Sequence, residues 1–501
     1  MEIQGYHIEK NPSFVGRRDE IRRLDEIVER KRASFIVVYG RRRVGKTELI
    51  EQYFCNDTVL KFEGIEIDKE DVRNYDERQK FQIDQSLKRL AKYLDNPLIG
   101  KVQCRTWGDF FDILSEVATK QNVVIYFEEI QWLANYESHF FSELKPFWDD
   151  RWRHNEKLKL VICGSSTSFI VGQLLSNKAI YSRSQEEFHL REFNLMEIRD
   201  YLGNKGHKET MLAQLTVGGI PEYLGRLKEK GTVLSNLCKN SFRPDAFFSL
   251  EKDKIFISSL SRNHNYQKIV EYLGRCKFAT ALEITKAIKG DSAGGGSVTR
   301  LLEDLSRCGF IKRYTPIHKD DQSKLIRYSI SDEYLQFYFR FIKPKLTKIQ
   351  NKSYVENTLQ GINKRSFETV MGFNFERWCQ KNASLFAKIL GFSGVEYESG
   401  SFFDAKTQMQ EKGFQIDLMY IIKGSKIIIC EIKFYDGLVD NRVCEEVKRK
   451  IELFQLSMQR YKNYTYEAVL ITTEGVRDSA TIQATFDHII TFEDIFDERY
   501  W

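Results

Sequence analysis

The sequence predicts an α/β protein built from several domains, because its 501 residues are too many for one hydrophobic core. Three observations predict the parts. An apolar run leads into a glycine-rich loop and a helix near residue 40, three helical patterns and a hairpin follow residue 254, and two adjacent strands carry charged residues near residue 417. We therefore expect a core over residues 1–195, a helical lid over 196–254, a helix-and-hairpin segment over 255–345, a helical connector over 346–365 and an α/β domain over 366–501.

The amino-acid composition narrows the possible class of protein only slightly. A hydrophobic content of 42% and a charged content of 30% fit an ordinary globular protein, and the formal charge of +6 neither requires nor excludes nucleic acid. Nine cysteines lie scattered, and the start of the chain shows no signal peptide, so we expect reduced thiols and a cytoplasmic location. No stretch approaches the roughly 18 apolar residues of a membrane span, and we expect no membrane partner.

The first part carries a phosphate-binding pattern. The apolar run Phe35 to Tyr39 predicts a buried parallel strand, and helical spacing begins at Glu48. Between them, glycines let backbone N–H groups converge on phosphate, Lys46 adds charge, and Thr47 can hold Mg²⁺. The pattern predicts a site for ATP and Mg²⁺ formed by Gly40, Arg41, Arg42, Arg43, Val44, Gly45, Lys46 and Thr47, with Lys46 also acting in catalysis.

A second buried strand, Val123 to Phe127, ends in two acids. A nucleotide-hydrolysing site needs an acid at such a strand end for the Mg²⁺ shell, and its neighbour can polarise the attacking water. We assign Glu128 to the metal shell and Glu129 to the water. Glu128 stands where Asp is usual, and the alternative is a solvated strand end.

Two further residues are candidates. The strand "LKLVICGSS" ends in Ser165 and Ser166, and a polar residue at this point can sense the γ-phosphate; of the two we assign this role to Ser166. Arg183 precedes another strand and is placed to reach the phosphates of a neighbouring subunit in a homo-oligomer; the alternative is a surface arginine.

The segments "FVGRRDEIRRL", "GRRRVGKT", "EEIQWL", "ICGSS", "YSR" and "GGIPEYL" occur in this order. Together they resemble the prokaryotic archaeal-type ATPases of the AAA+/STAND branch of P-loop NTPases, over roughly residues 10 to 250. The resemblance implies that Phe14 to Arg17 pack near the adenine. It also implies that Gly219, Ile220 and Pro221, inside the helical lid, touch the nucleotide region.

The segment over 255–345 has the order of a winged helix: three helical patterns, two strands and a closing helix. The start of the third helix, which normally enters the major groove, carries Ser297, Thr299 and Arg300. Lys and Arg outnumber Asp and Glu by seven in this segment, which fits a surface facing the phosphates of nucleic acid, with DNA expected. Winged helices also bind proteins, and that alternative stays open.

The C-terminal part places acids on two adjacent strands. Asp417 lies on "FQIDLMYII", and Glu431 and Lys433 lie two residues apart on "IIICEIKFY", so both face the same side. Two carboxylates suit Mg²⁺ or Mn²⁺, and the carbonyl of Ile432 offers a further ligand. A bound metal would activate water, and Lys433 would stabilise the charge that develops.

With Glu376 on the preceding helix, the order of acids resembles the PD-(D/E)XK nuclease superfamily, and the whole chain looks like ATPases that carry the DUF234 domain. The resemblance implies that Glu376, Asp417, Glu431 and Lys433 are catalytic. Ile416 stands where a proline is common, and no Gln-x-x-x-Tyr follows in register.

We therefore predict an ATP-dependent DNA-binding ATPase with a Mg²⁺-dependent C-terminal nuclease domain, serving defence or mobile-element maintenance. The alternative is an ATP-driven switch whose winged helix and inactive nuclease-like domain bind DNA or protein partners.

Overall fold

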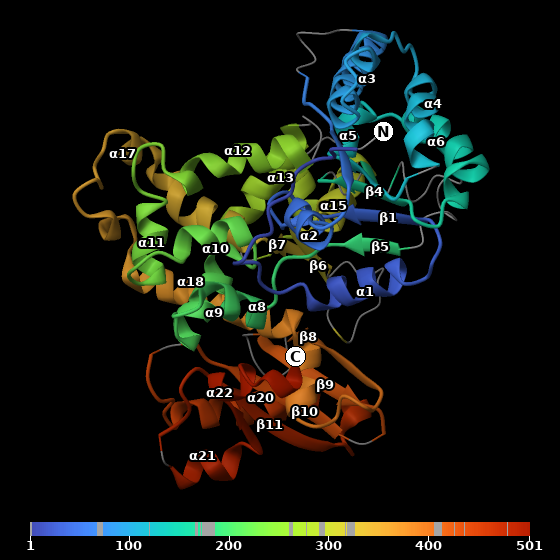
Figure 1. The fold of residues 1–501 in the computed structure, drawn as a ribbon. Helices are drawn as coiled ribbons and strands as arrows, with labels where there is room; N and C mark the ends of the chain where they lie inside the picture. Colours follow the sequence, from blue (N-terminus) through green and yellow to red (C-terminus); the bar gives the residue numbers. More distant parts are fainter. Residues whose placement is uncertain are drawn as a thin grey trace. The chain divides into compact units, whose positions relative to one another are not determined.

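The computed structural model describes residues 3–67, 74–119, 121–165, 169–170, 172, 186–259, 264–276, 278–289, 296–315, 317, 326–404, 413–424, 426–434, 436–477 and 479–501. The chain forms two compact units (Figure 1). The first comprises residues 1–193, 220–222 and 253–263, and the second comprises 194–219, 223–252 and 264–501. Among the described helices, none combines the length and the apolar character that a bilayer crossing requires. All nine cysteines carry free thiols.

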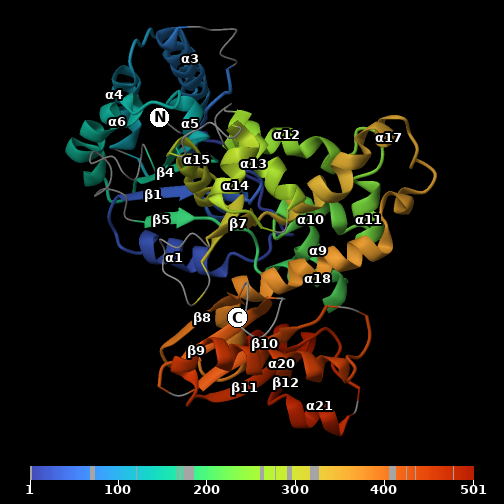
Figure 2. The ribbon, with the colours of Figure 1, turned by 180° about the vertical axis from the view of Figure 1, so that it is seen from behind.

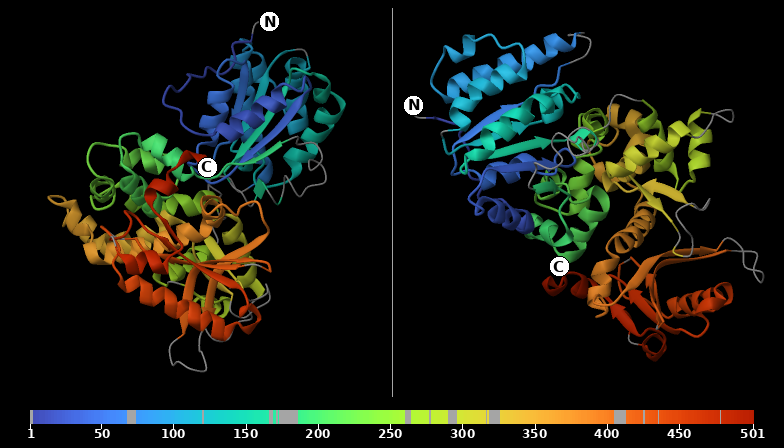
Figure 3. Two further views of the ribbon diagram at one scale, coloured as in Figure 1. Left: turned by 90° about the horizontal axis from the view of Figure 1, so that it is seen from below. Right: turned by 90° about the vertical axis from the view of Figure 1, so that its right-hand side faces the viewer.

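The first unit is built on a parallel sheet in the order β2-β3-β4-β1-β5 (Figure 3). Its strands are β1 (Ser34–Tyr39), β2 (Val59–Glu63), β3 (Val124–Glu128), β4 (Lys159–Gly164) and β5 (Glu186–His189). The central strands are almost wholly buried, as their continuous apolar runs predict. The predicted strands near residues 35 and 123 are confirmed.

The first helix of this unit precedes the sheet in the chain, and the helices that follow it connect the strands. The helices are α1 (Arg18–Val28), α2 (Lys46–Tyr53), α3 (Tyr75–Tyr93), α4 (Trp107–Ala118), α5 (Ile130–Leu133) and α6 (His139–Asp150), with short turns η1 (Ile99–Lys101) and η2 (Trp152–His154). Helix α2 begins at Lys46, two residues before the expected start.

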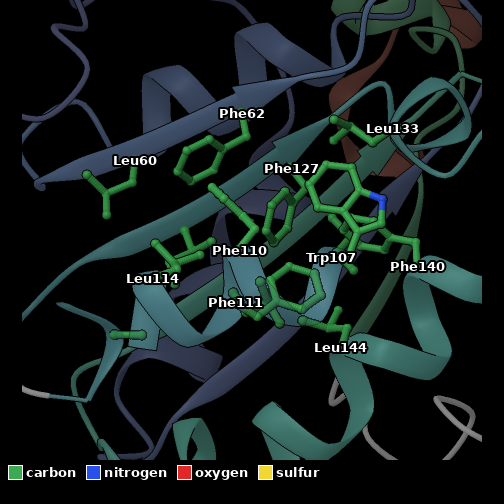
Figure 4. Packing of buried hydrophobic residues seen from close by; sticks show 14 of the residues in the cluster. Leu60, Phe62, Trp107, Phe110, Phe111, Leu114, Phe127, Leu133, Phe140 and Leu144 are labelled. Carbon is green, nitrogen blue, oxygen red and sulfur yellow. The ribbon is translucent and has the colours of Figure 1, made fainter. Parts of the chain in front are cut away.

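Aromatic side chains fill the space between this sheet and its helices (Figure 4). Phe110 of α4 meets Phe62 of β2 edge to face at a centroid distance of 5.3 Å, and Phe111 meets Phe127 of β3 at 6.1 Å. Such contacts add to the burial energy of each ring and fix β2 beside β3. The core therefore holds the carboxyl ends of these strands, where the candidate residues lie, in a defined position.

The predicted lid helices are α8 (Leu195–Leu202), α9 (His207–Val217), α10 (Pro221–Leu227), α11 (Val233–Lys239) and α12 (Phe247–Ser259). They belong to the second unit except for the start of α10 and the end of α12, which belong to the first. Three helices and an antiparallel hairpin follow in the predicted order: α13 (His264–Arg275), α14 (Ala281–Lys289), α15 (Gly296–Arg307), β6 (Ile311–Tyr314) and β7 (Arg327–Ile330). A closing helix comprises α16 (Glu333–Phe337), the π-helical turn η4 (Tyr338–Ile342) and the turn η5 (Lys343–Lys345).

The connector over 346–365 differs from expectation. We predicted a helical connector, but it contains only α17 (Leu346–Gln350), the turn η6 (Thr358–Gly361) and the start of α18. Lys352 adopts a left-handed conformation at φ 59°, and the Asn357 side chain accepts the N–H of Leu359. Such Asn side chains compete with the helical backbone and favour turns.

The C-terminal domain has a five-stranded mixed sheet in the order β12-β11-β10-β9-β8. Its strands are β8 (Tyr397–Asp404), β9 (Phe414–Ile422), β10 (Lys426–Ile432), β11 (Thr465–Ile471) and β12 (His488–Ile490). Its helices are α18 (Lys364–Lys381), α19 (Ala383–Ile389), α20 (Arg442–Ser457), α21 (Ala480–Thr485) and α22 (Phe492–Ile495), with turns η7 (Gln459–Tyr461) and η8 (Glu498–Tyr500). Figure 2 shows α20 beside the strands, and Val443, Val447 and Phe454 of α20 join the core that the sheet forms.

Candidate functional site

The glycine-rich loop links β1 to α2 and depends on its glycines. A Cβ on Gly40 would lie 2.3 Å from the carbonyl oxygen of Leu190, which no side chain tolerates. Gly45, at φ 91°, precedes α2 in a left-handed conformation that favours glycine. The loop thus presents backbone N–H groups at a helix N-terminus, the arrangement that binds phosphate.

Lys46 lies inside this loop. Its side chain is only 6% exposed, and Nζ donates to the carbonyl oxygens of Gly40 at 3.0 Å and Arg41 at 2.9 Å. These carbonyls hold the ammonium group at the carboxyl end of β1, where a phosphate oxygen would be a stronger partner than a neutral carbonyl.

Glu128 ends β3 and faces the loop. The Thr47 hydroxyl donates to Oε1 of Glu128, and the Tyr126 hydroxyl donates to the same oxygen at 2.9 Å. On the other oxygen, Nζ of Lys61 lies 2.7 Å from Oε2. The hydroxyl and the carboxylate assigned to Mg²⁺ therefore lie side by side, and this geometry fits the ion of a nucleotide site.

Sequence reasoning missed Lys61. It lies on β2, is 8% exposed, and also pairs with Glu51 at 2.7 Å. Burial works against the charged ammonium, but Glu128 and Glu51 outweigh it and raise the pKa of Lys61. A lysine inside the otherwise apolar run "VLKF" was the available signal.

Glu129 follows in a left-handed conformation at φ 50° and begins α5. Its Oε2 accepts the Ser165 hydroxyl at 2.7 Å and Nε2 of Gln131 at 2.5 Å. Ser165 directly follows β4, the neighbour of β3 in the sheet. A residue at the end of β4 therefore orients the carboxylate that follows β3.

Arg17 ties three segments together. It is 4% exposed, and its guanidinium donates to the carbonyl oxygens of Val44 at 2.7 Å and Arg191 at 2.8 Å. Arg17, which the resemblance placed near the adenine, therefore links the glycine-rich loop to the segment that follows β5.

Pro221 approaches the loop, as the resemblance implies. Its Cγ lies 3.9 Å from the position of a Cβ built on Gly45, and Arg43 pairs with Glu222 at 3.5 Å. Two candidates stay predictions, because Ser166 and Arg183 lie outside the described residues.

The C-terminal candidates meet at β9 and β10. Cys430 pairs with Leu418 in the antiparallel register, so Glu431 and Asp417 are the next residues along the two strands. The Asp417 carboxylate accepts a hydrogen bond from Nε2 of Gln415 at 2.7 Å. The Asp417 carbonyl oxygen accepts a hydrogen bond from Nε2 of Gln380, which lies on the same helix as Glu376.

Glu431 is 1% exposed, and lysines hold both of its oxygens. Nζ of Lys433 lies 2.8 Å from Oε1, and Nζ of Lys450 on α20 lies 2.7 Å from Oε2. Glu446 completes the cluster, 2.9 Å from Lys433 and 3.6 Å from Lys450. Burial opposes the charge of Lys450, but Glu431 and Asp417 outweigh it and raise the pKa of that lysine. Sequence reasoning did not foresee Lys450.

This cluster does not fit the predicted metal site as it stands. Within the described ranges, no three His, Cys, Asp or Glu side chains gather as ligands, and lysines occupy both oxygens of Glu431. Ile432, predicted to add a carbonyl ligand, is buried at the end of β10.

Comparisons with known proteins agree with the first site. Residues 14–227 match a family described as an ATPase domain predominantly from Archaea, and residues 338–451 match DUF234, archaeal and bacterial proteins of unknown function. The uncharacterized protein MJECL04 of Methanocaldococcus jannaschii is 26% identical over 367 residues, which are 73% of this chain and 76% of that protein. An uncharacterized ATP-binding protein of the same organism, MJ0423, is 41% identical over 46 residues, 9% of this chain and 78% of that protein.

One solved structure shares the fold over part of the chain. A Walker-type ATPase of Pyrococcus abyssi superposes with a TM-score of 0.50 at 17% identity, covering 67% of this chain and 98% of that one, which shows the fold alone. The ORC2 protein of Aeropyrum pernix gives a TM-score of 0.44 at 11% identity, covering 71% and 96%. Residues 14–227 are thus similar to ATPase domains found predominantly in Archaea, and residues 338–451 are similar to the DUF234 region.

Proposed function

We propose that this chain binds ATP with Mg²⁺ at the loop Gly40–Thr47, hydrolyses it, and uses the turnover to control how its other parts engage nucleic acid. One observation carries the first half of the proposal. The Thr47 hydroxyl, the Glu128 carboxylate and the Lys46 ammonium converge at the carboxyl ends of β1 and β3, the two strands that flank β4, beside a helix N-terminus.

Each residue has a distinct role. Lys46 would exchange its carbonyl partners for the β and γ phosphates, and Thr47 and Glu128 would hold the Mg²⁺ ion. Bound Mg²⁺ offsets the negative charge of the phosphates. Glu129 accepts a proton from, or orients, the attacking water, and its contact with Ser165 sets the direction of its carboxylate.

ATP turnover by the full chain tests this proposal. Lys46→Ala should abolish hydrolysis while the protein stays folded, and Lys88→Ala, an exposed lysine of the same unit, should match the wild type. Glu129→Gln should bind ATP and turn it over at least about a hundredfold more slowly. Unchanged hydrolysis by Lys46→Ala would refute the assignment of the loop.

We assign nucleic-acid binding, with DNA expected, to α15. Thr299, Arg300 and Arg307 lie on its exposed face, at the helix that a winged helix inserts into the major groove. Arg300→Ala and Arg307→Ala should each weaken DNA binding and lower the slope of its salt dependence by about one. Equal affinity and slope in both variants would favour a protein partner for this segment instead.

A second candidate function is metal-dependent cleavage of nucleic acid by the C-terminal domain. The observation that favours it is the adjacency of Asp417 and Glu431 in the strand register, with Lys433 in contact with Glu431. Supercoiled, linear and single-stranded DNA would be incubated with Mg²⁺ or Mn²⁺, with and without ATP, beside an Asp417→Ala/Glu431→Ala control. Cutting that the control loses supports this function; no cutting, with ATP hydrolysis intact, leaves a nucleotide switch that binds without cleaving.

A further inference from the structure

The Glu431 carboxylate already has a cation at each oxygen. Lys433 contacts Oε1 and Lys450 contacts Oε2, at 2.8 and 2.7 Å. The two lysines differ in their surroundings, because the Lys433 side chain is 26% exposed and the Lys450 side chain only 9%. Lys450 is therefore the cation built into the interior, and Lys433 is the one that reaches toward solvent.

We propose that Lys450 is a built-in competitor of divalent cations: its ammonium occupies Oε2 of Glu431, and the Asp417–Glu431 pair accepts a divalent cation only when that ammonium withdraws. This inference deepens the second candidate function, the C-terminal metal site, and rests on it.

Charge balance explains the present arrangement. A carboxylate as buried as Glu431 is stable only when it is neutralised, and the two lysines supply that neutralisation without a metal. A divalent cation needs the same oxygens, and its charge would lie close to two ammonium groups. Like charges at such separations in a buried site repel strongly, so the metal and Lys450 exclude one another.

Glu446 offers Lys450 an alternative partner. Its Oε1 lies 3.6 Å from Nζ of Lys450, and its side chain is 41% exposed. A rotation of the lysine side chain toward Glu446 would release Oε2 of Glu431 and keep the ammonium paired. Lys450 therefore has one partner in the metal-free arrangement and a second one within reach.

Binding of Mn²⁺ alone to the nucleotide-free full chain, followed by electron paramagnetic resonance, tests the proposal. Lys450→Met keeps the length of the side chain and removes the charge, so Mn²⁺ should bind about tenfold more tightly or more, a change of about 1.4 kcal/mol. Lys448→Met, an exposed lysine of the same helix, should match the wild type. Adding Asp417→Asn to Lys450→Met should cancel the gain, and equal affinity in Lys450→Met and wild type would overturn the proposal.

A second measurement, on the wild-type protein, tests the proposal even if the Lys450→Met variant does not fold. In the wild type, the amine reactivity of Lys450, read by mass spectrometry, should be low without metal and rise with saturating Mn²⁺, while Lys448 stays equally reactive. Glu446→Gln should suppress that rise, and unchanged Lys450 reactivity at saturating Mn²⁺ would overturn the proposal. DNA cleavage is measured separately. If Lys450→Met binds Mn²⁺ more tightly but no DNA is cut, the nuclease function is refuted and Lys450 remains the competitor. If DNA is cut but Lys450→Met binds Mn²⁺ no more tightly than the wild type, the nuclease function stands and the competitor role of Lys450 is refuted.

Discussion

Nζ of Lys61 lies 2.7 Å from Oε2 of Glu128, so a lysine on β2 neutralises the acid that ends β3. The two strands pair in parallel, and Lys61 lies opposite Tyr126, which donates to the other oxygen of Glu128. The acid assigned to Mg²⁺ is thus held in a balanced pair before any ion arrives, and this has a measurable consequence.

Lys61→Met should destabilise the nucleotide-free protein and increase its response to Mg²⁺ and ATP. Removing one partner of a buried pair costs about 3–5 kcal/mol, and we expect about 2–3 here because Thr47 and Tyr126 still donate to Glu128. Mg²⁺ with ATP would restore the missing positive charge. Thermal unfolding should therefore show a lower melting temperature without ligand and a larger ligand-induced rise than in the wild type.

The matched control is Lys88→Met, an exposed lysine in the same unit. It should change neither the melting temperature nor the response to ligand. An equal rise on adding Mg²⁺ and ATP to wild type and Lys61→Met would show that Lys61 does not compensate the charge of Glu128.

Ser165→Ala should slow ATP hydrolysis without weakening ATP binding. The Ser165 hydroxyl donates to Oε2 of Glu129 at 2.7 Å and holds the carboxylate in one direction. Without it, Glu129 would be less well placed toward the attacking water, and kcat should fall by about tenfold while KM stays within about twofold. A raised KM with unchanged kcat would instead mean that Ser165 contacts the nucleotide.

Local sequence patterns predicted much of this site. The apolar run before Gly40 and the spacing to Lys46 and Thr47 encode β1, the loop and α2, because each depends on neighbours in the chain. The same holds for the hairpin that brings Asp417 and Glu431 together. Strand ends and periodicity are local information, and the structure confirms these elements.

The partners of the charged residues were not predictable in this way. Lys61 pairs with Glu128, and Lys450 with Glu431, only because the sheet and the helix α20 bring distant segments together. In the sequence Lys61 stands out as a charge inside the apolar run "VLKF", whereas Lys450 lies in the charged segment "EEVKRKIE" and has no such signal. The lysine beside the predicted metal ligand Glu431 was missed for the same reason, since Lys450 comes from a helix that the strand pattern does not include.

Glu271→Gln should weaken α13 near neutral pH and have no effect in acid. The hydrogen bond from Lys343, at 2.5 Å, lowers the pKa of Glu271, with Arg275 assisting. A carboxyl group with a lowered pKa stabilises the fold above its ordinary pKa and loses that contribution as the pH falls through the folded value. Because the pair is partly exposed, we expect about 0.5–1 kcal/mol at pH 7, a smaller contribution at pH 4 and almost none near pH 2.

Hydrogen exchange of the α13 amides at pH 7 and pH 2 measures this difference. Glu303→Gln, an exposed glutamate on α15, serves as the control and should match the wild type at pH 7 and pH 2. A destabilisation of Glu271→Gln that persists in acid would mean that packing, and not charge, is what Glu271 contributes.

The lid helix α9 offers the last prediction. Its first residue is His207, whose ring stacks on Phe496 at a centroid distance of 4.2 Å. The next residue, Lys208, pairs with Asp436 and, at 3.5 Å, with Glu474. These acids follow β10 and β11, so the start of α9 lies at the carboxyl ends of the C-terminal strands. Its other end leads through Gly218 into the segment that carries Pro221, which approaches Gly45 of the nucleotide loop.

Lys208→Glu should therefore loosen the carboxyl ends of β10 and β11, because it replaces two ion pairs with repulsion. Hydrogen exchange over residues 436–440 and 474–477 should become faster, and the change that ATP produces there in the wild type should shrink. Lys230→Glu, an exposed lysine of the same unit, should leave both unchanged. If ATP alters this exchange equally in Lys208→Glu and wild type, α9 does not transmit the nucleotide state; if the difference disappears, the lid helix is the connection between ATP and the C-terminal domain.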